Sequence, residues 1–145
     1  MLNIKNLQKK VPIPRAKVLK AAKAAFRKLV VICHPEPFAS LEGRLREGSL
    51  SIVFVGTKRM RAINKKYLGH DYVTDVLTFD LGENTGEIII CPRIACANAK
   101  AHQTSMENEI ILYVIHGILH LAGFDDHKPK DIIQMRRMEN ELLKL

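Results

Sequence analysis

The 145-residue chain has few cysteines, no long uncharged run and long stretches without acidic residues. Its three cysteines, Cys33, Cys91 and Cys96, are odd in number and form no C-x-x-C pair, so we expect reduced, buried thiols rather than disulfides or metal ligands. With no secretory signal at residue 1, they favour a cytoplasmic protein. The longest uncharged run, 110–124, is too short for a bilayer and contains two histidines, which argues against a membrane helix.

Acidic residues are missing from the first 35 positions, which carry nine lysines and arginines. A second acid-free stretch holds Lys58, Arg59, Arg61, Lys65 and Lys66. The formal net charge is +8. Such a balance favours a polyanionic partner, nucleic acid above all, although a solvated basic surface has the same composition. If the partner is nucleic acid, we expect Lys58, Arg59, Lys65 and Lys66 to contact its phosphates.

The length and the apolar fraction of 47% predict one globular domain over residues 1–145. The expected class is α+β, a small mixed sheet of about four strands packed with about five helices, with the metal site described below on a central helix. The proline-rich stretch 34–48 is expected to be a loop. Hydrophobic periodicity predicts strands at 2–7, 49–55, 74–81 and 86–91, and helices at 15–31, 57–68, 92–103, 104 to about 122, and 129–145. The helix over 57–68 should bury Tyr67.

A capping box of Thr104 and Glu107 is predicted to open a helix that is apolar almost all round and therefore buried. Its second half carries His116 and His120, spaced i, i+4 on one helix face. Gly123 can adopt the left-handed conformation that ends many helices, so the chain can turn there and bring His127 to the same place. Three protein ligands with one open position are typical of a catalytic zinc, although nickel also takes imidazole and the two helical histidines could instead be hydrogen-bonded core residues.

The residue after His116 limits the reactions that such a site could catalyse. Zinc proteases with this helix have the motif H-E-x-x-H, in which the glutamate is the general base. Gly117 stands at that position and carries no proton-accepting group. Together with the positive charge, this favours a phosphodiester substrate and, in particular, RNA, which supplies a nucleophile in its own 2′-hydroxyl.

Three segments resemble the YbeY family of bacterial endoribonucleases. They are His116-Gly-x-Leu-His120-Leu-x-Gly123-Phe-Asp, Asn64-Lys-Lys-Tyr-Leu-Gly-His-Asp-Tyr-Val-Thr-Asp-Val-Leu-Thr-Phe79, and Gly86-Glu-Ile-Ile-Ile-Cys91. The resemblance implies an α+β fold, a zinc ion on three histidines, and a single-strand-specific endoribonuclease. It also implies a role in maturing the 3′ end of small-subunit ribosomal RNA and in ribosome quality control.

The chain departs from the family pattern at two positions. The family's third histidine comes ten positions after the first, where this chain has Asp126, and the histidine follows as His127. We expect His127 to be the ligand, with Asp126 as the alternative or as a supporting residue, because carboxylate oxygen also binds zinc. Leu68 stands where the family often has an arginine proposed to contact RNA. Asp75 either holds a ligand histidine in its tautomer or bonds to nearby backbone, and the sequence leaves both roles open.

Two other functions are compatible with the residues. One is a metal-dependent hydrolase of another substrate, such as a peptide, which Gly117 disfavours. The other is a non-catalytic ribosome assembly factor with a structural zinc, which fits the charge equally well. An open position on the metal would favour the enzyme, and a closed shell of four ligands would favour the assembly factor.

Overall fold

The computed structural model describes residues 1–32, 49–83 and 85–144, so the predicted loop at 34–48 and Cys33 lie outside the described residues. The predicted strands and helices within this part are confirmed, with bounds that differ by a few residues. In chain order they are β1 (Leu2–Asn6), α1 (Arg15–Ile32), β2 (Ser49–Phe54), α3 (Thr57–Leu68), β3 (Val76–Gly82), β4 (Thr85–Ile90), α4 (Pro92–Ala101), α5 (Met106–Leu121) and α6 (Pro129–Leu142).

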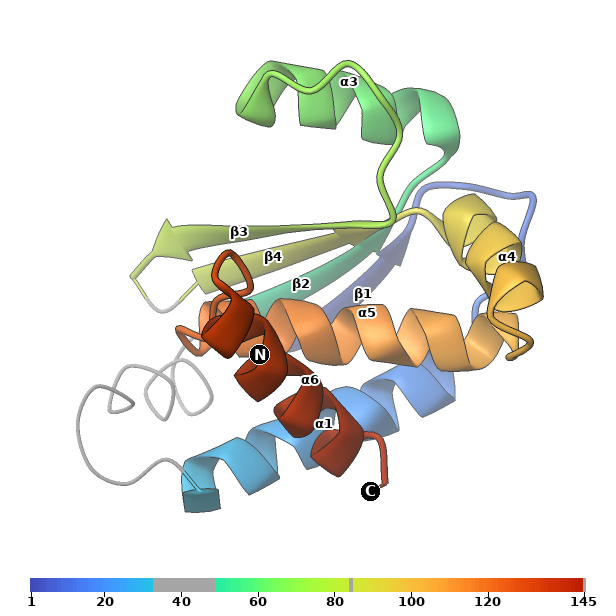
Figure 1. Ribbon diagram of the computed structural model, residues 1–145. Coiled ribbons are helices and arrows are strands. Elements are labelled where there is room, and N and C mark those ends of the chain that lie inside the picture. The colour runs from blue at the N-terminus through green and yellow to red at the C-terminus, as the bar shows by residue number, and fades with distance from the viewer. Residues whose placement is uncertain (33–48, 84, 145) are drawn as a thin grey trace.

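The four strands form one mixed sheet in the order β1-β2-β4-β3. β1, β2 and β4 are parallel, and β3 runs antiparallel to β4 as an edge strand. Helices α1, α5 and α6 lie on one side of the sheet, and α3 lies on the other (Figure 1). Side chains alternate accordingly along β4, where Ile88 and Ile90 join the main core and Ile89 joins a smaller cluster with Met60 of α3.

α5 is the central helix of the main core, as its apolar sequence predicts. Its buried residues include Tyr113, Ile115, Ile118 and Leu119. Gly117 allows the helix to approach the sheet closely, since a Cβ atom at this position would lie only 2.8 Å from Cδ1 of Ile88. Neither α5 nor any other helix in the described part of the chain is long and apolar enough to cross a membrane.

The start of α5 differs from the predicted capping box. The N-cap residue is Ser105, whose side chain accepts a hydrogen bond of 3.0 Å from the backbone N–H of Asn108. Glu107 instead forms an ion pair of 2.6 Å with Lys17 of α1. The prediction that Thr104 caps the helix is therefore wrong by one residue, because serine at the next position caps it and accepts from the N–H of Asn108 instead of that of Glu107.

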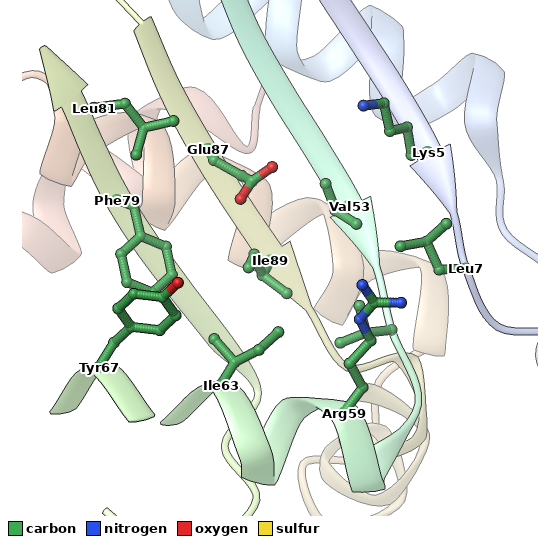
Figure 2. Close-up of a pocket in the computed structure, with 11 residues that line it drawn as sticks. Lys5, Leu7, Val53, Arg59, Ile63, Tyr67, Phe79, Leu81, Glu87 and Ile89 are labelled. Atoms are coloured by element: carbon green, nitrogen blue, oxygen red, sulfur yellow. The ribbon is translucent and has the colours of Figure 1, made fainter. Parts of the chain in front are cut away.

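Tyr67 is also placed differently from its prediction, because its side chain is 59% exposed. Its ring lies edge-on to Phe79 of the edge strand β3, with the ring centroids 5.4 Å apart (Figure 2). The helical pattern identified the face of α3 that turns towards the sheet, but the last turn of that helix extends over an open part of it. Cys91 and Cys96 are free thiols, the first buried and the second half-buried.

Candidate metal centre

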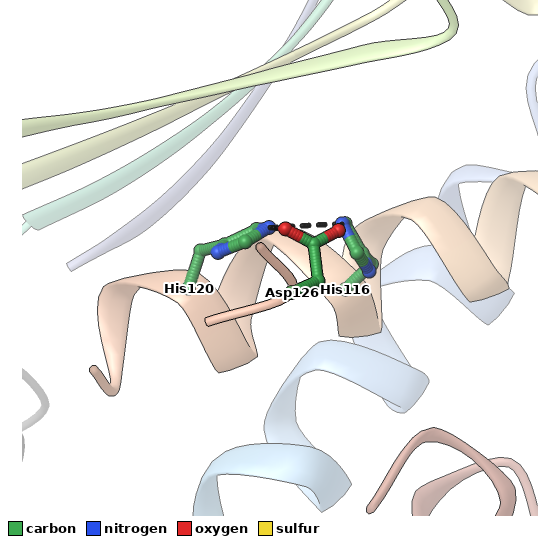
Figure 3. A group of neighbouring side chains, drawn as sticks. All are labelled: His116, His120 and Asp126. Atoms are coloured by element: carbon green, nitrogen blue, oxygen red, sulfur yellow. Dashed lines mark hydrogen bonds and ion pairs between the residues drawn. The ribbon is translucent and has the colours of Figure 1, made fainter. Parts of the chain in front are cut away.

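His116 and His120 lie one turn apart near the C-terminal end of α5, with their rings pointing towards each other (Figure 3). Their Nε2 atoms are 2.9 Å apart, and the ring planes are nearly perpendicular at 87°. Both side chains are about three-quarters buried, with 23% and 27% exposure. The i, i+4 spacing therefore brings two imidazole nitrogens together at a partly desolvated point.

The turn after α5 brings a carboxylate to the same two nitrogens. Gly123 has a φ of 88°, the left-handed conformation predicted for it. The chain reverses there, and Asp126 places Oδ2 at 3.6 Å from Nε2 of His116 and Oδ1 at 3.8 Å from Nε2 of His120. Two rings and one carboxylate thus converge from a helix and the loop that follows it.

The other ring nitrogen of each histidine is held by a hydrogen-bond acceptor. Nδ1 of His116 lies 2.6 Å from Oε1 of Glu139 on α6. Nδ1 of His120 lies 3.0 Å from the backbone carbonyl of Phe124. A carbonyl and an ionised carboxylate can only accept, so both Nδ1 atoms carry the proton and donate. In the neutral rings, both Nε2 atoms then present lone pairs to each other and to the Asp126 carboxylate.

With both rings neutral, the two facing Nε2 acceptors fit a cation between them. Nitrogen and oxygen ligands of tetrahedral zinc, bound at about 2.0–2.2 Å, lie roughly 3.3–3.6 Å from one another. The observed separations of 2.9, 3.6 and 3.8 Å are close to that range. One ligand atom from each of His116, His120 and Asp126 lies within 4.8 Å of the others, so these residues could hold a metal ion.

The pKa values of the two histidines shift in opposite directions. Burial lowers the pKa of His120, and the neighbouring charge of His116 lowers it further. For His116, burial also acts to lower the pKa, but the hydrogen bond and charge of Glu139, with smaller contributions from Asp126 and Asp75, raise it overall. The carboxylate on α6 therefore fixes the tautomer of His116 and increases the basicity of its ring, as acceptors behind metal-bound histidines do.

His127, the predicted third ligand, lies outside this group of three. Its side chain is 80% exposed, and its Nδ1 donates to the carboxylate of Asp125. The same nitrogen is 4.0 Å from Oδ1 of Asp126, so it borders the site through that residue. The histidine's role as a ligand stays a prediction, and Asp126 is the residue of this turn that groups with both helical histidines among the described residues.

Asp75 contacts backbone and side-chain groups next to it. Its Oδ1 accepts from the N–H of Val76 at 2.8 Å and from the hydroxyl of Thr74 at 3.0 Å. Its charge acts on His116 only as a small contribution to the raised pKa. Within the described residues, the acceptor that orients His116 is Glu139. Sequence spacing gave no signal for Glu139, because it lies 23 positions after the histidine on another helix.

The four predicted phosphate contacts separate into two pairs. Lys65, together with Arg61, forms an ion pair with Asp71. Nζ of Lys66 lies 5.0 Å from the ring centre of Tyr67. Lys58 and Arg59, in contrast, line a cavity beside the start of α3. The four side chains therefore have different surroundings, and their contact with phosphates stays a prediction.

Comparison with known proteins identifies relatives of this chain. The family profile described as "Endoribonuclease YbeY" matches residues 3–145. The chain belongs to the YbeY family. A YbeY relative described as an endoribonuclease in Chlorobium luteolum is 38% identical over 97 residues, 65% of this chain and 71% of its own length. Another, from Thermotoga neapolitana, is 46% identical over 76 residues, 52% of this chain and 51% of its own length.

One solved structure resembles the whole fold. The solution structure of TM1509 from Thermotoga maritima superposes with a TM-score of 0.62 at 28% sequence identity, covering 99% of this chain and 87% of that one. The YbeY match across the chain, together with this likeness, establishes the α+β architecture. The alignments to these two relatives cover only part of their lengths.

Proposed function

We propose that this chain is a metal-dependent endoribonuclease that cleaves single-stranded RNA and matures the 3′ end of small-subunit ribosomal RNA in the cytoplasm. The observation that carries the proposal is the pair of Nε2 atoms of His116 and His120, which face each other 2.9 Å apart beside the carboxylate of Asp126. Family membership supports RNA as the substrate class. The net charge of +8 supports a polyanion independently of the family.

His116, His120 and Asp126 would hold the ion, zinc in the first instance, with nickel as the other metal suited to imidazole. When bound to three protein ligands, zinc lowers the pKa of a coordinated water to about 7 and so makes a nucleophile accessible near neutral pH. Glu139 and the carbonyl of Phe124 keep both rings in the tautomer that leaves Nε2 free. His127 remains the alternative third ligand.

Gly117 stands at the position of the general base in H-E-x-x-H proteases, and this supports nucleic acid over peptide as the substrate. A glutamate general base would need to reach the metal, but position 117 points at the sheet, against Ile88. No carboxylate can be accommodated there without displacing the central helix. The protein therefore lacks the general base of H-E-x-x-H proteases, whereas RNA carries its own hydroxyl nucleophile.

The test is to replace His116 by alanine and measure both zinc content and RNA cleavage. We expect both to fall together, while the exposed His70, replaced by alanine as a matched control, leaves both unchanged. Zinc content is measured by elemental analysis after dialysis, and cleavage with a labelled single-stranded ribosomal RNA fragment. Full cleavage by the metal-free His116→Ala protein would refute the mechanism.

A further inference from the structure

A cavity of about 500 Å³ lies at the carboxyl ends of the three parallel strands, far from the histidines. The segments after β1 and β2, and Arg93 in the first turn of α4, surround it. Five of the residues that line it are cationic, and none is acidic: Lys9, Lys10, Lys58, Arg59 and Arg93. In open α/β sheets, the carboxyl ends of neighbouring parallel strands are a common place for a ligand.

In the part of the chain that the structure describes, no ion pair joins a carboxylate to any of the five cations of this basic pocket. Within the described residues, the carboxylates that form ion pairs do so with other partners, as Asp71 does with Arg61 and Lys65. The pocket is also close to the N-terminus of α3, where Gly56 offers no side-chain cap and the first turn contains no acidic residue. Concentrating uncompensated positive charge in one concave place is unfavourable unless an anion binds there.

A second cavity, of about 370 Å³, continues from the basic pocket across the face of the sheet that α3 partly covers. The two cavities share Leu7 and Arg59. Beyond these, the apolar groove is lined mainly by Val53, Ile89 and the rings of Tyr67 and Phe79 (Figure 2). A basic pocket that opens into an apolar groove with aromatic rings is the combination by which proteins bind single-stranded nucleic acid, phosphates on cations and bases on rings.

The far end of the groove leads towards the metal centre. There it is bordered by Leu81 of β3 and by Glu87 of β4. The residue before Glu87, Gly86, faces the opposite side of the sheet, where a Cβ atom would lie 2.8 Å from Leu121, the residue after His120. The groove therefore ends at the same end of the sheet as the histidine-bearing part of α5, with β4 and the edge strand β3 between them.

We infer that the basic pocket and the apolar groove form a second RNA-binding surface, on the opposite side of the sheet from the metal centre. The phosphates of a single strand bind in the basic pocket, and its bases lie in the apolar groove against Tyr67 and Phe79. The strand then passes over the edge of β3 to the metal centre. Glu87 disfavours phosphates in the groove itself and can accept a hydrogen bond from a base amino group. This inference rests on the proposal that RNA is the substrate.

The test measures binding without cleavage, on full-length protein in the presence of a chelator, by the fluorescence anisotropy of a labelled oligouridylate. The pocket variant combines Lys9→Gln, Lys58→Gln and Arg93→Gln. The control variant carries the same charge change on the exposed face of α1, with Lys20→Gln, Lys23→Gln and Arg27→Gln. All six side chains are exposed, so folding is expected to be unaffected.

The pocket variant should bind at least about tenfold more weakly, and the slope of log K against log salt should decrease by about 2, the loss of three phosphate contacts. The control variant should weaken binding by less than about threefold, through net charge alone. Equal weakening by the two variants would overturn the assignment of the pocket.

The apolar groove is tested separately with two exposed tyrosines. Tyr67→Leu removes a ring from the groove, whereas Tyr72→Leu removes one that stacks on His70. Loss of a base-stacking ring should weaken oligouridylate binding by about fivefold or more for Tyr67 only. Equal effects, or displacement of the RNA by polyglutamate of the same charge, would overturn the role of the bases. Failure of the wild-type protein to cleave RNA with metal present is a separate result, which concerns the metal centre alone.

Discussion

Replacing Asp126 by alanine is expected to abolish tight metal binding, whereas replacing its neighbour His127 is not. The carboxylate of Asp126 lies 3.6 and 3.8 Å from the two Nε2 atoms, close to the separations of ligands on one zinc ion. His127 is 80% exposed and donates to Asp125. One residue therefore faces the site, and the other faces solvent.

The size of the effect follows from the number of ligands. Loss of a residue that merely orients a ligand costs about 10–100-fold in metal affinity, so loss of one ligand of three should cost more than about 100-fold, or about 2.7 kcal/mol. For His127→Ala we expect a change of less than about threefold, since only a neighbouring charge is altered. Asp126→His, which restores the family pattern, should keep tight binding.

The assay strips the purified proteins with chelator and titrates them with Zn²⁺ against a chromophoric competitor. Thermal unfolding of the metal-free proteins controls for damage to the fold. If His127→Ala loses affinity while Asp126→Ala retains it, then the turn rearranges on binding and the reasoning from these distances is refuted.

Three other changes test individual contacts. Glu139→Ala should lower zinc affinity about 10–100-fold by releasing His116, and Glu139→Gln should recover part of this loss because its amide oxygen still accepts a hydrogen bond. Equal zinc affinities of Glu139→Ala and the wild-type protein would contradict the orienting role. Gly117→Ala should destabilise the protein by about 1–2 kcal/mol in urea unfolding, since crowding against Ile88 outweighs the better helix propensity, and unchanged stability would show that the helix can shift. Leu68→Arg should strengthen RNA binding and steepen its salt dependence by about 0.7, the value of one added phosphate contact; an unchanged slope would show that position 68 does not reach the RNA.

The elements of the fold were predictable from the sequence because they depend on local periodicity. The apolar pattern of α5 identified it as the central helix, and the spacing of His116 and His120 placed two ligands on one face of it. The left-handed turn at Gly123 was also predicted from local chemistry, and its φ of 88° confirms it.

Features that depend on how distant segments pack were not predictable in the same way. Glu139 reaches His116 only because α6 docks beside α5, and no spacing rule links positions 23 apart. Tyr67 lies on the predicted face of α3, but the pattern does not show whether the sheet opposite is covered. The choice between Asp126 and His127 depends on which side chain of the turn points towards the two helical histidines. The spacing of residues along the chain does not show this.

The hydrogen bond from His116 to Glu139 links the metal centre to the last helix of the chain. By thermodynamic reciprocity, a metal that binds better when α6 is docked also holds α6 in place. At a metal concentration of 100 times Kd, occupancy stabilises the folded state by about 2.7 kcal/mol. Local opening of α6 should therefore become rarer as metal binds, and its amide hydrogens should exchange more slowly. The rate of amide hydrogen exchange in α6 should therefore depend on whether a metal ion is bound by His116 and its neighbours.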